Sequence, residues 1–211
     1  VSTFCHAIAR DEPITISDPD RELSLVHVDD VVRTLLADIA DLPAGGVHWR
    51  DAAPQHQITL GRLAELIRSF RASRQNLIVP DFADPFAHTL YSVYLSYLPT
   101  DEFAYNLRQH KDARGSLAEF IKSPNVGQIF VSRTVPGITR GNHFHHVKTE
   151  KFLVLEGEAV IRFRKIGGSE VLEYPVRGEE YRVVDIPPGY THSIENVGQV
   201  ELVTLFWASE L

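Results

Sequence analysis

Three histidines and one glutamate are spaced so that they could hold a metal ion. The first two histidines stand two positions apart, the glutamate follows five residues later, and the third histidine comes after a Pro-Pro-Gly turn at residues 187–189. On a strand, side chains two positions apart point to the same side, so the first two imidazoles are expected to face one way. A single histidine is usually an ordinary core or surface residue, but four donors at this spacing predict a metal site. The candidate ligands are His143, His145, Glu150 and His192.

The composition limits what kind of metal site this could be. The chain has one cysteine, Cys5, which excludes an internal disulfide and a thiolate-rich zinc site. Any metal must therefore be bound by imidazole and carboxylate groups. Three imidazoles and one carboxylate suit a divalent first-row metal, and they leave room for water or substrate if the coordination number exceeds four.

Charge and hydropathy exclude other classes of partner. The formal net charge of −7 argues against binding to a nucleic-acid polymer, which needs an excess of Lys and Arg. The longest apolar runs, such as 202–208, are far too short to cross a bilayer, and no charged-then-apolar leader opens the chain. We therefore expect a cytoplasmic protein with no nucleic-acid or membrane partner. Its 211 residues allow one large domain or two small ones.

Residues 1–98 show helical periodicity interrupted by a short strand. Apolar residues recur at helical spacing over 28–42, the acidic pair at 29–30 suits a helix N-terminus, and Pro43 ends the helix. Thr59 is expected to cap the next helix. The expected elements are helices over Val1–Arg10, Val28–Leu42, 60–70 and Pro85–Leu98, and a strand over Ile14–Ile16.

From Gly115 onward the pattern changes to short strands between turn signals, which indicates a sandwich or barrel. The two strands that flank Glu156-Gly157 are expected to form a hairpin, and His192 is expected to lie on another hairpin. We place the domain boundary at 98/99, which gives domains 1–98 and 99–211. The expected strands are Ile129–Thr134, Lys151–Leu155, Ala159–Arg164, Tyr181–Ile186, Thr191–Glu195 and Glu201–Trp207.

Two stretches around the candidate ligands resemble the two motifs of the cupins. Residues 137–157 match G-x5-H-x-H-x4-E-x6-G at every position, and residues 187–196 match P-x-G-x2-H-x3-N. The leading glycine that is usual in the second motif is replaced by Tyr181, with Gly178 as the nearest alternative. The resemblance implies an all-β cupin barrel, a double-stranded β-helix or jelly roll, whose metal is held by the four candidate ligands.

Further segments resemble enzymes that act on nucleotide sugars. Residues 112–115 resemble the D-x-R-G segment of nucleotide-sugar 3,5-epimerases, and residues 140–143 resemble their R-G-x-H segment. Residues 21–32 resemble a segment in the substrate lobe of extended short-chain dehydrogenases. Together they resemble the bifunctional capsular-polysaccharide enzymes, which join an N-terminal reductase to a C-terminal cupin epimerase. The implied fold is therefore α+β over 1–98, a substrate lobe, followed by an all-β cupin over 99–211.

This resemblance implies a metal-dependent epimerase acting at C3 of a UDP-linked 4-keto-6-deoxy-N-acetylhexosamine, with zinc as the expected metal and a homodimer as the expected assembly. Moving a proton at the carbon beside a ketone needs a base and an acid. If His143 is a ligand, it cannot also be the base. The candidate catalytic residues are His146, Lys148 and Tyr190. The candidate residues for the UDP-sugar diphosphate are Arg114 and Arg140, with Arg162 and Arg164 as possible additions.

The reductase half of the resemblance is incomplete. The first glycine is Gly45, so there is no glycine-rich dinucleotide fingerprint, and no tyrosine has a lysine four residues later. The chain also lacks methionine, even at position 1, so we expect a fragment of a longer protein, and NADPH binding only in that longer chain. Two alternatives for the cupin stay open: an iron-dependent dioxygenase, and a non-catalytic zinc module used for sugar binding or dimerisation.

Overall fold

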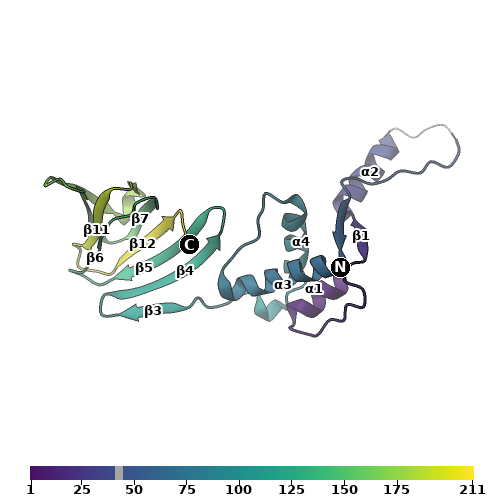
Figure 1. Ribbon diagram of the computed structural model, residues 1–211, viewed down its shortest axis with the longest axis horizontal. Coiled ribbons are helices and arrows are strands. Elements are labelled where there is room, and N and C mark those ends of the chain that lie inside the picture. The colour runs from purple at the N-terminus through teal and green to yellow at the C-terminus, as the bar shows by residue number, and fades with distance from the viewer. Residues whose placement is uncertain (41–44) are drawn as a thin grey trace. The chain divides into compact units, whose positions relative to one another are not determined.

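The computed structural model describes residues 1–40 and 45–211. They form two compact units, one of residues 1–73 and 80–104, the other of residues 74–79 and 105–211 (Figure 1). Residues 99–104 thus belong with the first unit, and a short segment before them, 74–79, belongs with the second. Among the described residues, no helix is both long and apolar enough to cross a membrane.

The first unit is built from helices and a two-stranded sheet. Its buried core joins three helices through Cys5 of α1, Leu63, Ile67 and Phe70 of α3, and Tyr94 of α4. Two antiparallel strands, β1 and β2, pair beside them. The elements are α1 (Ser2–Ala9), β1 (Glu22–Leu25), α2 (Val28–Ala40), β2 (His56–Thr59), α3 (Leu60–Asn76), α4 (Pro85–Leu95) and the short 3-10 helix η1 (Thr100–Glu102).

The four predicted helices are present, and their starts follow from local capping. Thr59 Oγ1 accepts a hydrogen bond from the backbone N of Arg62 at 3.3 Å, as expected for a helix cap. Asp84 does the same for α4. The strand predicted over Ile14–Ile16 is wrong, because those residues make no ladder bonds and the strand begins at Glu22. The predicted end of α2, at Leu42 and Pro43, lies outside the described residues.

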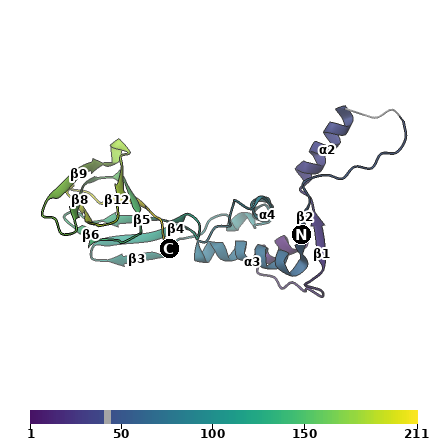
Figure 2. The same cartoon turned by 45° about the horizontal axis from the view of Figure 1, so that its top comes forward.

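The second unit consists of two antiparallel sheets that face each other (Figure 2). The six-stranded sheet has the order β10-β7-β12-β5-β4-β3, and the four-stranded sheet has the order β6-β11-β8-β9. This is a cupin-like arrangement. Its strands are β3 (Gln109–Asp112), β4 (Gly115–Ser123), β5 (Gly127–Thr134), β6 (Thr139–His143), β7 (Glu150–Glu156), β8 (Glu158–Lys165), β9 (Val171–Arg177), β10 (Val183–Ile186), β11 (Tyr190–Asn196) and β12 (Leu202–Ala208), with the 3-10 helix η2 (Gly178–Glu180) before β10.

The core of this unit lies between the two sheets. Alternate residues point inward, so Phe152 and Val154 of β7 are buried while their neighbours are less so. Phe206 of β12 stacks on Phe130 with ring centroids 4.8 Å apart, and it meets Phe152 edge-on at 4.5 Å. From β8, Ile161 and Phe163 complete the same apolar cluster.

The predicted hairpins are wrong, because the chain changes sheets where a hairpin was expected. β7 pairs with β10 and β12, whereas β8 pairs with β11 and β9. Gly157 makes the crossing possible: its φ is +88°, and a Cβ there would lie 3.2 Å from the Glu201 carbonyl oxygen. β10 and β11 are also in different sheets, so His192 lies on a strand that pairs with β6 and β8.

The expected strands omit four strands of this unit, β3, β4, β6 and β9, and in none of these four does burial alternate regularly. Every residue of β3 is exposed, and β9 buries a single residue, Val176. Both lie at sheet edges, where a strand is held by backbone bonds on one side and needs no apolar face.

Candidate functional site

The four candidate ligands come together at one end of the barrel. One ligand atom from each of them lies within 4.8 Å of the others. His143 ends β6, Glu150 begins β7, and His192 lies on β11, while His145 follows β6 in a loop. The strand alternation used to pair the first two histidines therefore ends at His143, and the loop brings His145 back toward the others, with the two ring centroids 4.9 Å apart.

A glycine lets β6 approach β11 closely enough to pair two of the ligands. His143 lies opposite His192 in the β6–β11 register, next to an irregularity between His192 and Ser193. Gly141 has a φ of +96°, and a Cβ there would lie 2.8 Å from the carbonyl oxygen of His192. Any side chain at Gly141 would push β6 away, so the R-G-x-H segment needs this glycine for a steric reason.

The carboxylate of Glu150 is the charged centre of the cluster and is only 6% exposed. Its Oε2 lies 3.4 Å from Nε2 of His145 and 3.3 Å from Nε2 of His192, and its Oε1 lies 3.6 Å from Nζ of Lys148. Burial alone would raise the pKa of Glu150, but these neighbours together hold that pKa below its ordinary value. The glutamate is thus kept as a carboxylate, the form that binds metals. Burial and the two other histidines lower the pKa of His143, which favours the neutral imidazole that ligation needs.

The ring nitrogens of the cluster lack the partners that buried polar atoms normally have. Nε2 of His145 and both ring nitrogens of His192 are buried and make no hydrogen bond of good geometry. Such atoms are costly to leave unpaired. A divalent ion would satisfy both Nε2 atoms and the adjacent carboxylate at once. The donor set therefore fits a metal.

The cluster opens into a cavity of about 270 Å³ between the sheets, which we call the metal pocket. His143, Glu150 and His192 line it, and so do both arginines predicted to bind substrate, Arg114 and Arg140. The remaining lining is mostly apolar. It consists of Leu117, Phe130, Ser132, Gly141, Phe152, Ile194 and Phe206.

Of the two arginines of the metal pocket, only Arg114 is paired with a carboxylate among the described residues. Asp112 accepts hydrogen bonds from Arg114 Nε at 3.0 Å and from Nη2 at 2.5 Å. Arg140 instead donates from Nε to Thr134 Oγ1 at 2.9 Å and from Nη2 to the carbonyl of Arg133 at 3.4 Å. Burial and the charge of Arg114 both lower the pKa of Arg140. Two guanidiniums with one carboxylate leave this wall of the pocket with an excess of positive charge.

The other two arginines considered from the sequence do not line the metal pocket. Arg162 is paired with Glu173 and Glu195, and Arg164 donates to the backbone carbonyl of Gly168 at 3.4 Å.

The three candidate catalytic residues lie in different surroundings. Lys148 is beside the cluster through its contact with Glu150. His146 is exposed and packs edge-on against Phe144, with ring centroids 5.2 Å apart. Tyr190 lines a different cavity and packs against Phe163, at 6.4 Å between centroids. The structure therefore brings only Lys148 of these three next to the candidate ligands.

Sequence reasoning missed two pocket residues on β5. Ser132 and Thr134 are 1% and 2% exposed, and Ser132 lines the pocket while Thr134 holds Arg140. Polar residues at alternate positions directly after the apolar run 129–131 were the signal that could have identified them.

Comparison with known proteins agrees with this geometry. Residues 110–211 match the family model described as the polysaccharide biosynthesis C-terminal domain. Over its whole length the chain is 42% identical to UDP-2-acetamido-2,6-beta-L-arabino-hexul-4-ose reductase of Pseudomonas aeruginosa, and it covers 56% of that protein.

Solved structures show the same relationship. The capsular polysaccharide assembling protein CapF of Staphylococcus aureus is 45% identical over 99% of this chain, with a TM-score of 0.92, and the chain covers 61% of it. A structure of CapF with the inhibitor 3-isopropenyl-tropolone is equally similar, with a TM-score of 0.93 and 60% of that chain covered. The chain thus spans less than two thirds of these relatives. Residues 110–211, which have the cupin-like arrangement of two sheets, are thus similar to the polysaccharide biosynthesis C-terminal domain.

Proposed function

We propose that the cupin, residues 99–211, is a metal-dependent epimerase that acts at C3 of a UDP-linked 4-keto-6-deoxy-N-acetylhexosamine, a precursor of a capsular or surface polysaccharide. One observation carries the proposal: an imidazole–carboxylate cluster suited to a divalent metal shares a pocket with two arginines that suit a diphosphate. The names of the relatives support it, since one is a reductase of a UDP-linked hexul-4-ose and another assembles capsular polysaccharide.

Residues 1–98 are proposed to be the substrate lobe of an extended short-chain dehydrogenase, the remnant of an NADPH-dependent C4 reductase. The support is identity over the full chain with a protein named as a reductase. Productive NADPH binding would then require a longer chain. The cytoplasmic location and the homodimer stay predictions.

The charges of the metal pocket favour an anionic substrate. Arg114 is paired with Asp112, whereas Arg140 has no carboxylate partner among the described residues and makes no hydrogen bond to them through its Nη1. Guanidinium groups bind phosphate oxygens in pairs of parallel hydrogen bonds. A diphosphate at this wall would leave the sugar ring beside the histidine cluster. The excess of positive charge at this wall therefore suits an anionic nucleotide sugar.

The chemistry requires a proton to leave C3 and to return on the opposite face. A divalent metal held by His143, His145, Glu150 and His192, for which we expect zinc, would supply Lewis-acid polarisation of the neighbouring keto oxygen. Lys148 is the candidate closest to the cluster and is the first choice for moving the proton. The apolar walls, Phe130, Phe152 and Phe206, exclude water around the reacting carbon.

Hydrogen exchange at C3 tests the proposal. The metal-loaded chain, incubated in deuterium oxide with the UDP-linked 4-keto-6-deoxy sugar, should place deuterium at C3, as read by NMR or mass spectrometry. Lys148→Met should lose most of this exchange while the metal stays bound. Arg164→Gln, outside the pocket, is the matched control and should exchange like the parent. His146→Ala and Tyr190→Phe test the other two candidates in the same assay.

The alternatives predict different results. Absence of exchange in the metal-loaded parent at saturating substrate would reject the epimerase. Oxygen uptake with iron bound would then support a dioxygenase, and metal-dependent stability without turnover would support a structural zinc module.

A further inference from the structure

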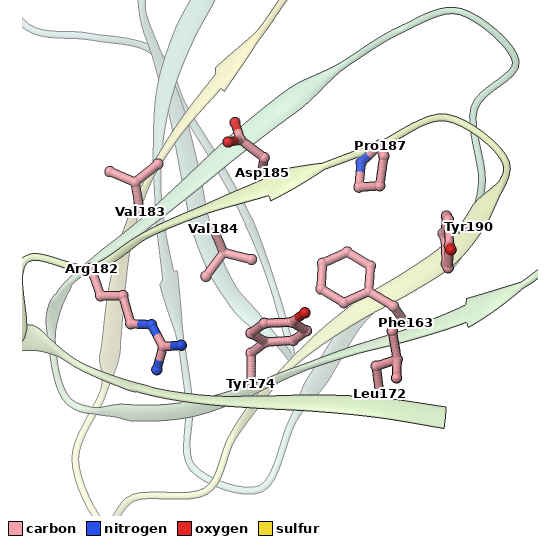
Figure 3. A pocket seen from close by; sticks show the side chains of 9 residues that line it. All are labelled: Phe163, Leu172, Tyr174, Arg182, Val183, Val184, Asp185, Pro187 and Tyr190. Atoms are coloured by element: carbon pink, nitrogen blue, oxygen red, sulfur yellow. The ribbon is translucent and has the colours of Figure 1, made fainter. Parts of the chain in front are cut away.

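The second unit contains another cavity, of about 350 Å³, which shares no lining residue with the metal pocket. It lies between β8 and β9 of one sheet and the segment from η2 through β10 to the start of β11 (Figure 3). We call it the aromatic pocket. Its lining residues are Phe163, Leu172, Tyr174, Arg182, Val183, Val184, Asp185, Pro187 and Tyr190.

Three aromatic rings form the inner walls of the aromatic pocket. The ring of Phe163 is perpendicular to that of Tyr174, with centroids 5.5 Å apart, and also to that of Tyr190, at 6.4 Å. Figure 3 shows Phe163 between the two tyrosines. Phe163 is 4% exposed and belongs to the core cluster, so core packing fixes the ring that the two tyrosines contact. Concave sites with apolar walls and a few polar groups are typical of small-molecule binding.

Three polar groups of this pocket can donate a hydrogen bond to a ligand, the guanidinium of Arg182 and the hydroxyl groups of Tyr174 and Tyr190. Arg182 lies with its guanidinium carbon 5.9 Å from the Tyr174 ring centroid and donates to the Pro175 carbonyl at 3.3 Å. Within the described ranges no carboxylate pairs with Arg182. The one acidic residue of the lining, Asp185, is paired with Lys151. The described residues also offer no hydrogen-bond partner to the hydroxyl groups of Tyr174 and Tyr190. A ligand that complements such a pocket carries acceptors, and best a negative charge.

The residue that directly precedes Arg182 of the lining has a backbone conformation that is unfavourable for its type. Tyr181 has φ 47° and ψ 40°, in the left-handed region, and its side chain is 74% exposed, so packing does not compensate. This is the position where the cupin motif has glycine. Gly178 meets the steric demand of the turn instead, since a Cβ there would lie 2.6 Å from the Leu155 carbonyl oxygen. An exposed aromatic ring in strained backbone, directly before Arg182, indicates a role in binding.

We propose that the aromatic pocket is a second ligand site, which binds a small ring-bearing anion. The ring, either aromatic or a pyranose, packs against Tyr174, Phe163 and Tyr190. Its carboxylate or phosphate group pairs with Arg182, and Tyr181 covers it from the rim. The site is separate from the metal pocket and does not depend on the epimerase assignment.

Binding of four small probes to the full 211-residue chain tests this proposal. 4-Fluorobenzoate and glucuronate carry the ring and the charge, and 4-fluorobenzyl alcohol and glucose are their neutral counterparts. Ligand-observed NMR should show the charged member of at least one pair binding about tenfold more tightly than its neutral counterpart. The pair that binds identifies the ring as aromatic or saccharide.

Variants then locate the site. Arg182→Gln should weaken the charged probe about tenfold. Arg177→Gln is the matched control, because Arg177 is on β9 near the pocket but lies outside the lining and pairs with Glu158. Tyr181→Gly should weaken binding of the ring-bearing probe, because it removes the tyrosine ring. The same change should raise the melting temperature, because glycine adopts the left-handed backbone conformation without strain. The proposal is overturned if no charged probe binds or if the neutral probes bind equally well. It is also overturned if the Arg182 and Arg177 variants bind the charged probe alike. Loss of binding in Arg140→Gln would likewise overturn it, because the probe would then lie in the metal pocket.

Discussion

Arg140 is held at the wall of the metal pocket by Thr134, whose Oγ1 accepts a 2.9 Å hydrogen bond from the guanidinium Nε. Thr134 is itself fixed, because its backbone carbonyl accepts a 2.8 Å hydrogen bond from the side chain of Asn196, which is completely buried. Asn196, the asparagine of the second cupin motif, is thus connected to Arg140 by two successive hydrogen bonds through Thr134. In the described part of the chain, Nη1 of Arg140 makes no hydrogen bond and can face a ligand.

Replacing Thr134 should therefore weaken substrate binding more than it weakens the fold. Thr134→Val removes the acceptor at nearly constant volume and should raise the Kd for UDP about tenfold, the effect of losing a hydrogen bond to a charged group. Thr134→Ser should restore most of the affinity. Thr204→Val removes another buried threonine hydroxyl, on the neighbouring strand β12, and is the control. Calorimetry measures all three, and equal losses for the Thr134 and Thr204 valine variants would contradict a positioning role.

Metal content checks the ligand set directly. We expect about one divalent ion per chain after purification without chelator, and loss of that ion in His145→Ala and Glu150→Gln. His146→Ala is the neighbouring control and should keep it. The metal-loaded parent should also melt at a higher temperature than the chelated protein, because an ion that binds only the folded state stabilises it. A parent that contains no metal by elemental analysis would refute the site.

The 211-residue chain should not bind NADPH in a saturable way. The backbone amides of a glycine-rich turn, which hold the pyrophosphate of a dinucleotide, have no counterpart in its sequence. Isothermal calorimetry with NADPH, and with UDP as the positive control, measures this. Saturable heat from NADPH would show that the residues present form a cofactor site.

Cys5 should be unreactive in the folded protein. It is completely buried in the core of the first unit, and burial raises the pKa of its thiol to about 11, so little thiolate exists at neutral pH. Titration with a chromogenic disulfide reagent should show slow labelling that becomes immediate in denaturant. Rapid labelling without denaturant would mean that the packing of α1 against α3 and α4 opens readily.

Acid should remove a stabilising contact in the first unit. Asp11 accepts hydrogen bonds from Arg71 at 3.1 Å and 2.5 Å, and these hold the pKa of Asp11 below its ordinary value. The stabilisation is therefore complete above about pH 4 and is lost as the pH falls through the lower pKa of the folded state. Urea unfolding from about pH 6 to about pH 2 should show a shallower pH dependence for Asp11→Asn than for the parent. Asp18→Asn removes an exposed carboxylate and should leave the slope unchanged.

Much of the candidate metal site was predictable from the sequence. His143, His145, Glu150 and His192 converge as expected, because cupin motifs place ligands at fixed offsets around two strand ends. Six of the ten strands of the second unit and all four helices of the first unit were also predictable, since alternation and helical spacing indicate which side of an element is buried. Arg114 and Arg140 were found from short segments, and both line the metal pocket.

Strand pairing and the division of polar residues between cavities were decided only by the tertiary structure. The turn at Glu156-Gly157 has the local signals of a hairpin, yet β7 and β8 belong to opposite sheets. Periodicity tells which face of a strand is buried but not which sheet the strand joins, because pairing partners lie far apart in sequence. For the same reason Tyr190, two residues before the ligand His192, could not be assigned from sequence to the aromatic pocket. Phe152 lines the metal pocket and Phe163 lines the aromatic pocket, and both belong to the core between the two sheets. Which cavity a residue lines therefore depends on both sheets together.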